Sequence, residues 1–178
     1  MYVLSTPVAK VGFILPPKTG TRSTERALRE VGAVSHAGRH GVSRPHLDEC
    51  DALVSNVRNP FDVLVSWYHY QEFRAKPPKT NKTFDEWFDS AVRKGKNSYL
   101  GVSTLKHAEN ASKFLRYEQG LESQVREYLF GLGFFLKEFP HIGAAKERTD
   151  YRGYYSTKLR DEVLERYRND FERFGYDW

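Results

Sequence analysis

The sequence predicts an α/β protein, a three-layer sandwich built on a mainly parallel sheet. Three short segments, 11–15, 33–36 and 52–57, combine apolar and β-branched residues in the manner of buried strands. Residues 113–117 give a fourth strand. Helical periodicity alternates with these strands, which is typical of parallel strands joined by crossover helices. The length of 178 residues suits one compact domain over 1–178.

The intervening helices are predicted from apolar spacing and from end signals. Residues 21–31 carry a helical apolar stripe that stops at a glycine. A helix over 60–71 begins at a proline that follows an asparagine cap. Residues 83–86 form a Thr-x-x-Glu capping box, which begins a further helix. Apolar stripes over 121–132 and 159–174 predict two more.

Composition narrows the classes of partner. Lysine and arginine (28) outnumber aspartate and glutamate (23), and the formal charge of +5 favours anionic ligands. The single cysteine, Cys50, excludes an internal disulfide and a cysteine-cluster metal site. The first residues lack a basic start followed by an apolar run, and no apolar stretch is long enough to cross a bilayer. We therefore expect a soluble, cytoplasmic protein without a membrane partner.

A phosphate-binding loop is predicted between the first of these strands and its helix. Residues 15–24 read Leu-Pro-Pro-Lys-Thr-Gly-Thr-Arg-Ser-Thr and lead into a helix N-terminus, where backbone N–H groups and the positive helix end converge on an anion. Gly20 lets the main chain approach closely, and Lys18 adds a mobile charge. Hydroxyl and guanidinium donors surround them at Thr19, Thr21, Arg22, Ser23 and Thr24.

This loop differs from the loop of metal-dependent nucleotide kinases. A Walker A loop places its lysine directly after the second glycine of Gly-x-x-x-x-Gly-Lys-[Ser/Thr]. Here Lys18 precedes Gly20, so that pattern fails. An ordinary polar strand-to-helix turn would have similar residues, and a second motif is needed to choose between them.

A second anion site is predicted where the third of these strands runs into its helix. Residues 57–68 read Val-Arg-Asn-Pro-Phe-Asp-Val-Leu-Val-Ser-Trp-Tyr. With the helix beginning at Pro60, Ser66 lies about 9 Å along its axis, a gap that Arg58 can span. Both side chains can therefore donate to one phosphate beside the helix. A capped core helix explains the proline but not the interval between Arg58 and Ser66.

Together the two segments resemble the motifs of the sulfotransferases that use 3′-phosphoadenosine-5′-phosphosulfate (PAPS). Residues 17–21 resemble the 5′-phosphosulfate loop of that family, Pro-Lys-[Ser/Thr]-Gly-Thr. Residues 58–66 resemble its 3′-phosphate motif, Arg-Asn-Pro-x-Asp-x-x-x-Ser, at every defining position. Further similarity at 116–118, 154–156 and 174–176 points to the carbohydrate-type branch.

The resemblance implies a P-loop-like fold, PAPS as the donor, adenosine 3′,5′-bisphosphate as the product, and no metal. It implies a hydroxyl or amine acceptor, with glycans among the candidates. Lys18 would then stand beside the leaving bridging oxygen, and Arg152 would belong to the cations that close over the donor. Two residues depart from the common pattern: Arg22 stands where threonine is commoner, and Ser23 stands where small-molecule members usually have tryptophan.

Sulfuryl transfer needs in-line geometry, charge stabilisation and a general base for the acceptor. His36 is the first candidate, because it follows a strand at the carboxyl edge of the sheet, where reacting groups gather. Its distance before Arg58 also resembles the interval of the catalytic histidine in cytosolic sulfotransferases. His40 is the second candidate, and a carboxylate base or a purely solvated histidine stays open.

Two other functions remain open at this stage. One is a nucleotide kinase, which the misplaced lysine disfavours. The other is a non-catalytic module that binds a nucleotide or a glycan. A nucleic-acid partner is not expected, because lysine and arginine are spread along the chain and no base-reading motif is present.

Overall fold

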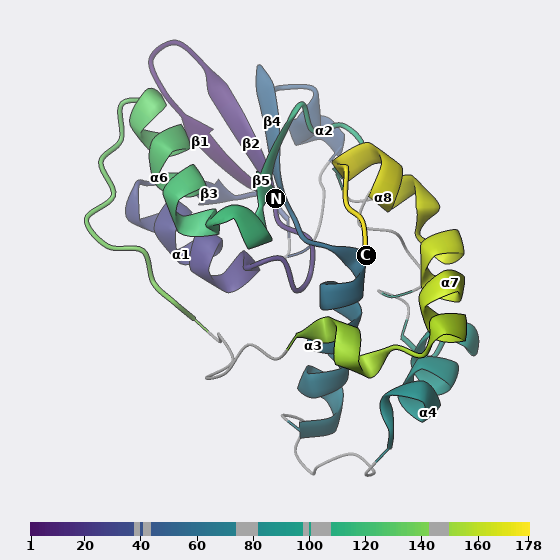
Figure 1. The fold of residues 1–178 in the computed structure, drawn as a ribbon. Coiled ribbons are helices and arrows are strands. Elements are labelled where there is room, and N and C mark those ends of the chain that lie inside the picture. Colours follow the sequence, from purple (N-terminus) through teal and green to yellow (C-terminus); the bar gives the residue numbers. More distant parts are fainter. Residues whose placement is uncertain (38–39, 41–43, 74–81, 98–99, 101–107, 143–149) are drawn as a thin grey trace. The chain divides into compact units, whose positions relative to one another are not determined.

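The computed structural model describes residues 1–37, 40, 44–73, 82–97, 100, 108–142 and 150–178. The chain divides into two compact units, Met1–Arg58 with His107–Lys146 and Asn59–Lys106 with Glu147–Trp178. The first unit contains the sheet, and the described part of the second unit is helical (Figure 1). The mixed α/β class predicted from the sequence is confirmed.

A five-stranded sheet in the order β3-β1-β2-β4-β5 is the framework of the first unit. Its strands are β1 (Tyr2–Ser5), β2 (Lys10–Ile14), β3 (Val34–Ser35), β4 (Ala52–Val57) and β5 (Lys113–Arg116). β4 pairs in parallel with β2 and with β5. β1 pairs antiparallel with both β2 and β3, so the other four strands share one direction. The mainly parallel sheet is therefore confirmed, and the ends of β2, β3, β4 and β5 lie at one edge.

The N-terminal strand β1 is a strand of the sheet that the sequence analysis did not predict. It forms a hairpin with β2, in which Tyr2 pairs with Phe13 and Ser5 pairs with Lys10. The turn is closed by the Thr6 N–H, which donates to a carbonyl three residues later at 2.8 Å. Because β1 lies between β3 and β2, β3 stands two strands away from the strand that leads into the phosphate loop.

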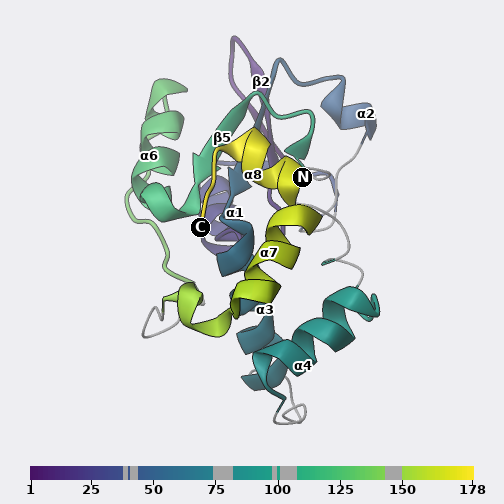
Figure 2. The same cartoon turned by 45° about the vertical axis from the view of Figure 1, so that its right-hand side comes forward.

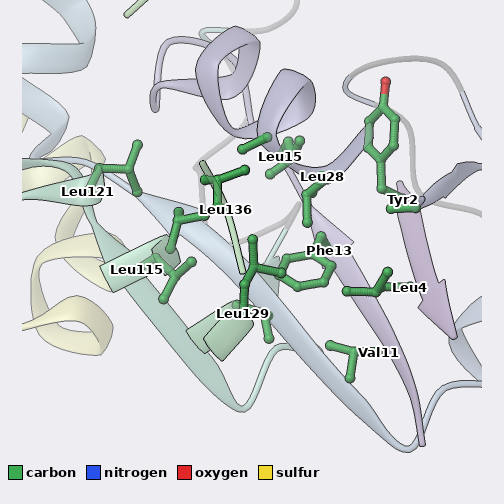
Figure 3. Close-up of a cluster of buried hydrophobic side chains, with 14 of the residues drawn as sticks. Tyr2, Leu4, Val11, Phe13, Leu15, Leu28, Leu115, Leu121, Leu129 and Leu136 are labelled. Atoms are coloured by element: carbon green, nitrogen blue, oxygen red, sulfur yellow. The ribbon is translucent and has the colours of Figure 1, made fainter. Parts of the chain in front are cut away.

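Apolar side chains from the sheet and from two helices form the core of the first unit (Figure 3). α1 (Thr21–Glu30) and α6 (Leu121–Gly131) both contribute to it. They pack against Val11, Phe13 and Leu15, which alternate along β2 and its continuation. The short helix α2 and the single turn η2 complete the unit, with bounds Arg44–Leu47 and Tyr117–Gln119.

The described part of the second unit is built from helices around an aromatic core. Its elements are α3 (Pro60–Phe73), α4 (Phe84–Phe88), the π-helical turn η1 (Asp89–Arg93), the 3-10 turn η3 (Tyr151–Tyr154), α7 (Thr157–Arg166) and α8 (Arg168–Phe174). Several aromatic side chains share this core, among them Phe61, Tyr68, Phe84, Trp87, Phe88 and Phe171. Among the helices of the described residues, none combines the length and the apolar character needed to cross a bilayer.

The predicted helix starts of this unit are confirmed. The Asn59 side chain accepts a hydrogen bond from the Phe61 N–H at 3.0 Å, one residue after Pro60. Thr83 and Glu86 form both hydrogen bonds of the capping box at the start of α4. These caps fix where α3 and α4 begin.

The predicted C-terminal helix over 159–174 is instead two helices, α7 and α8, which meet at Tyr167 (Figure 2). Tyr167 leaves helical geometry, with φ of −109° and ψ of 22°. Its buried hydroxyl donates to the Leu100 carbonyl at 2.6 Å. The apolar stripe continues through both helices, so periodicity alone could not reveal the break.

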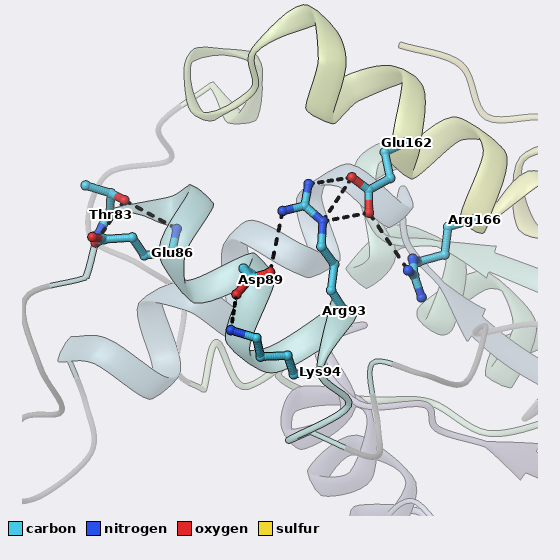
Figure 4. Close-up of polar contacts among 7 residues, drawn as sticks. All are labelled: Thr83, Glu86, Asp89, Arg93, Lys94, Glu162 and Arg166. Carbon is cyan, nitrogen blue, oxygen red and sulfur yellow. Dashed lines mark hydrogen bonds and ion pairs between the residues drawn. The ribbon is translucent and has the colours of Figure 1, made fainter.

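A charged network links η1 to α7 (Figure 4). Arg93 Nε donates to both carboxylate oxygens of Glu162, at 3.0 and 3.1 Å, and Arg166 lies 3.8 Å from the same carboxylate. The hydrogen bonds from Arg93 lower the pKa of Glu162 below its ordinary value. On the same turn, Lys94 pairs with Asp89 at 2.7 Å.

Candidate functional site

The predicted phosphate loop lies at the carboxyl edge of the sheet, between β2 and α1. Gly20 is the N-cap residue of α1 and has a left-handed backbone, with φ of 80°. A Cβ at this position would lie 2.3 Å from Leu121 Cδ2, so both the backbone and the space favour glycine. Lys18 also has a positive φ, 66°. Such strained conformations concentrate at functional sites.

The loop is held by its own threonines. Pro16 O accepts hydrogen bonds from the hydroxyls of Thr19 and Thr21, at 2.7 and 2.5 Å. Gly20 O accepts two backbone N–H groups from the first turn of α1, both at 3.1 Å. Thr19, Thr21 and Thr24 are all buried, so their hydroxyls brace the loop. The sequence analysis expected these hydroxyls to act as anion donors, and in the structure each of them donates a hydrogen bond to a main-chain carbonyl.

Two side chains from the end of β4 hold the next carbonyls of the loop. Arg58 Nη1 donates to Lys18 O at 2.8 Å. Asn56 Nδ2 donates to Thr19 O at 3.1 Å. The carbonyl oxygens of successive loop residues are thereby turned toward the protein.

The loop therefore presents N–H groups rather than oxygens. In a trans peptide the C=O and the following N–H point in opposite directions, so holding the carbonyls aims the amides outward. Among the described residues no side chain caps α1, and its first turn contains no acidic residue. An uncapped N-terminus with outward amides and a positive helix end binds phosphate or sulfate.

Arg58 connects the two predicted motifs. It directly follows β4 and is half-buried. Besides its hydrogen bond to the loop, its guanidinium carbon lies 4.2 Å from the ring centroid of Tyr117, the residue that follows β5. The contact with the ring and the hydrogen bond to the loop carbonyl together restrict the guanidinium.

The other residues predicted around the loop differ in exposure. Arg22, in the first turn of α1, is exposed. Ser23 is buried, and its hydroxyl oxygen accepts the Ile142 N–H at 3.0 Å. Ser23 thus ties the chain that follows α6 to the start of α1.

Ser66 and Arg152 belong to the second unit. Ser66 is half-buried on α3. Arg152 lies in η3, exposed, with its Nη1 3.5 Å from an Asp150 carboxylate oxygen and its guanidinium over the Tyr151 ring. Arg152 is therefore a surface cation whose ion-pair partner, Asp150, lies two positions before it in the sequence.

The two candidate bases occupy different positions in the first unit. His40 Nδ1 lies 3.0 Å from Leu15 O, at the start of the phosphate loop. Because a carbonyl can only accept, Nδ1 carries the hydrogen, and Nε2 is the proton-accepting nitrogen of the neutral ring. His36 follows β3 and is exposed, and its ring lies tilted against that of His46, with ring centroids 4.1 Å apart. Two strand spacings separate β3 from β2, about 10 Å.

Sequence reasoning missed Asn56 as a loop contact. A signal was present, because an amide side chain stands inside an otherwise strand-like apolar segment, where it needs a polar partner. Tyr117 was noted in the sequence as part of the resemblance but not assigned to the site. Within the described ranges, no group of three or more His, Cys, Asp or Glu side chains is arranged to hold a metal ion.

Comparison with known proteins adds a structural likeness. No protein-family model matches the sequence, and no curated protein matches it. A crystal structure of the mouse sulfotransferase SULT7A1 complexed with PAP is similar to this chain, with a TM-score of 0.54. The two share 17% sequence identity, and the match covers 89% of this chain and 84% of that chain. The likeness shows that this chain has the mixed α/β, P-loop-like fold of that sulfotransferase.

Proposed function

We propose that the protein is a sulfotransferase that moves a sulfuryl group from PAPS to a hydroxyl or amine of an acceptor, with residues 1–178 acting as one domain. The observation that carries the proposal is the hydrogen bond from Arg58 to Lys18 O at 2.8 Å. Arg58 and Lys18 are 40 positions apart in the sequence, and this contact joins the arginine of one motif to the loop of the other. A donor with phosphate groups at two ends requires anion sites that are neighbours.

The loop and the start of α1 are proposed to bind the 5′ end of the donor. Its outward amides and the positive end of α1 suit the phosphosulfate, and Lys18 supplies a mobile cation. Arg58 and Ser66 are proposed to bind the 3′-phosphate, on the basis of their interval in the sequence. Arg22 and Arg152, both exposed, are proposed to add charge around the bound donor.

In the proposed reaction Lys18 stabilises the negative charge that develops on the leaving group. The acceptor oxygen or nitrogen attacks sulfur in line, and the bond from sulfur to the bridging oxygen breaks. The bonding electrons go to that oxygen, which stays on the 5′-phosphate of adenosine 3′,5′-bisphosphate. Electrostatic stabilisation of this charge is the main contribution that the protein can make, and no metal is required.

His40 is the better supported of the two candidate bases. Its ring is anchored at the loop through Leu15 O, and the anchored tautomer places the basic lone pair on Nε2. His36 stays a candidate because it follows β3 at the same edge of the sheet. The deprotonating base receives the acceptor proton as the new S–O or S–N bond forms.

The remaining proposals concern the partner and the setting. A glycan acceptor and a cytoplasmic location follow from the sequence resemblance and composition. The nucleotide-kinase alternative is not favoured, because the lysine precedes Gly20. A non-catalytic nucleotide-binding module would have the same anion-binding loop but would not transfer a sulfuryl group to an acceptor.

The test is transfer of labelled sulfate from PAPS to a panel of glycans, phenols and peptides, read as sulfated mass without added metal. The proposal predicts a labelled product and stoichiometric adenosine 3′,5′-bisphosphate. Phosphate transfer from ATP with magnesium, and none from PAPS, would identify a kinase. Tight binding of adenosine 3′,5′-bisphosphate with no product from any acceptor class would favour the binding module.

A further inference from the structure

Asn56 is a buried amide whose side chain donates hydrogen bonds to the phosphate loop and to the helix that follows it. It lies on β4 with none of its surface exposed. Its Nδ2 donates one hydrogen bond to Thr19 O at 3.1 Å and another to Thr24 Oγ1 at 2.8 Å. Both amide hydrogens are therefore used, one on each side of the Gly20 cap.

This amide is a poor choice for stability alone. Its Oδ1 is buried and has no hydrogen-bond partner among the described residues. A buried acceptor without a partner costs free energy that an apolar side chain of similar shape would avoid. Val54 and Val57 of the same strand are apolar and fully buried. An unsatisfied group kept at such a position requires another explanation.

The geometry of the peptide group supplies that explanation. The Thr19 carbonyl and the Gly20 N–H belong to the same peptide plane and point in opposite directions. When Asn56 draws Thr19 O toward β4, it aims the Gly20 N–H away from the sheet. The second bond, to Thr24, ties the first turn of α1 to the same amide, so the loop and the helix end move together.

We propose that Asn56 is a positioning residue for the 5′ end of the donor. It acts through the loop, by fixing the outward direction of the Gly20 N–H and its register with α1. The inference rests on the proposed function for the identity of the anion. It differs from the roles of Lys18 and Arg58, because Asn56 has no exposed surface with which to touch a ligand.

The test compares two ligands that differ at the 5′ end. Adenosine 3′,5′-bisphosphate carries the 5′-phosphate and adenosine 3′-phosphate lacks it. The dissociation constant of adenosine 3′-phosphate divided by that of adenosine 3′,5′-bisphosphate therefore measures the contribution of the loop. Asn56→Leu keeps the approximate shape and removes both donors. We expect it to reduce this ratio about tenfold, equivalent to about 1.4 kcal/mol. Affinity for adenosine 3′-phosphate should change less than about twofold, since no contact to the 3′ end is altered.

Three further variants complete the design. Asn56→Asp is isosteric and also lacks the donors, and Thr24→Val removes one of the two acceptors. Each should reduce the same ratio, and either replaces Asn56→Leu should that variant fail to fold. Ser55→Ala is the matched control, because Ser55 is fully buried on the same strand and, within the described residues, its hydroxyl bonds to the neighbouring Asn56 carbonyl at 3.1 Å and not to the loop. Its ratio should equal that of the wild type.

The outcomes separate the inference from the proposed function. A wild-type protein that binds both ligands equally has no 5′-phosphate site at the loop, and both proposals fail. A wild-type preference that persists in folded Asn56 variants overturns the positioning role alone. Equal weakening of both ligands would also overturn it, because that result reports general damage. With PAPS and a working acceptor, the positioning role further predicts a lower kcat as well as a higher KM for PAPS in Asn56→Leu.

Discussion

Because Arg58 contacts the phosphate loop, Arg58→Ala should weaken the binding of adenosine 3′,5′-bisphosphate. Arg58→Ala removes a charged donor that lies 2.8 Å from Lys18 O and a guanidinium that lies 4.2 Å from the Tyr117 ring centroid. Hydrogen bonds that involve a charged group contribute about 1.5–3 kcal/mol. The loss in affinity for adenosine 3′,5′-bisphosphate should therefore be about tenfold to 150-fold, at 1.4 kcal/mol per decade.

Arg58→Lys keeps the charge but loses the planar fork and its stacking on Tyr117. It should recover only part of the lost affinity, because a lysine donates as a point charge and cannot grip an oxyanion with two parallel bonds. Lys10→Ala is a suitable control, since it removes the same charge at the start of β2, the opposite end of the strand that leads into the loop. That control should leave affinity within about twofold, because an exposed charge remote from the site is screened.

The assay is titration calorimetry with adenosine 3′,5′-bisphosphate and with adenosine 5′-phosphate. In the wild type the first ligand should bind more tightly, and Arg58→Ala should erase most of that difference. Equal affinity of the wild type for nucleotides with and without the 3′-phosphate would refute the assignment. If Lys10→Ala lost as much affinity as Arg58→Ala, the loss would come from the change in net charge and not from a specific contact of Arg58.

Three further outcomes are expected. His40→Ala should lower kcat about 10²–10⁴-fold while affinity for adenosine 3′,5′-bisphosphate changes little, whereas a loss confined to His36→Ala would transfer the role of base to His36. Gly20→Ala should abolish bisphosphate binding in a protein with native circular dichroism, because its Cβ would lie 2.3 Å from Leu121 Cδ2 and φ is 80°. Glu162→Gln should lower the free energy of unfolding by about 0.5–1 kcal/mol at pH 7. The pKa of Glu162 is lowered in the folded protein, so this contribution is fully present above the ordinary value of 4.5 and is lost as pH falls through the lowered pKa of the folded state. Chemical denaturation should therefore show a larger difference between the wild type and Glu162→Gln at pH 7 than at pH 3.

The strands that lead into the two anion motifs could be predicted because they are short, apolar and followed by strong helix signals. The strand β4 is bounded as predicted, and the helix after it begins at Pro60. The N-terminal strand β1 was not predicted from the sequence. Its two-sided pairing with β2 and β3 depends on contacts distant in sequence, which periodicity does not encode.

The sequence predicted which residues form the loop of the candidate site, but not which groups their side chains contact. The motif locates Thr19, Thr21 and Thr24 at the loop, and a hydroxyl in a motif suggests a ligand contact. In the structure their hydroxyls contact main-chain carbonyls and Asn56, and these bonds brace a loop that has two left-handed residues. Asn56 itself lies 32 positions after Thr24 in the sequence, so the pairing emerges only when β4 and β2 come together.

The hydrogen bond between Asn59 and Asp177 has a consequence for folding during synthesis. Asn59 Nδ2 donates to Asp177 O at 3.0 Å, across 118 positions, and the Trp178 ring lies 4.6 Å from Phe61. The residue that caps α3 therefore receives this partner from a residue that is synthesised 118 positions later. Contacts of such long range form late, so the opening turn of α3 should acquire its native protection from solvent exchange only after residues 177 and 178 have been synthesised.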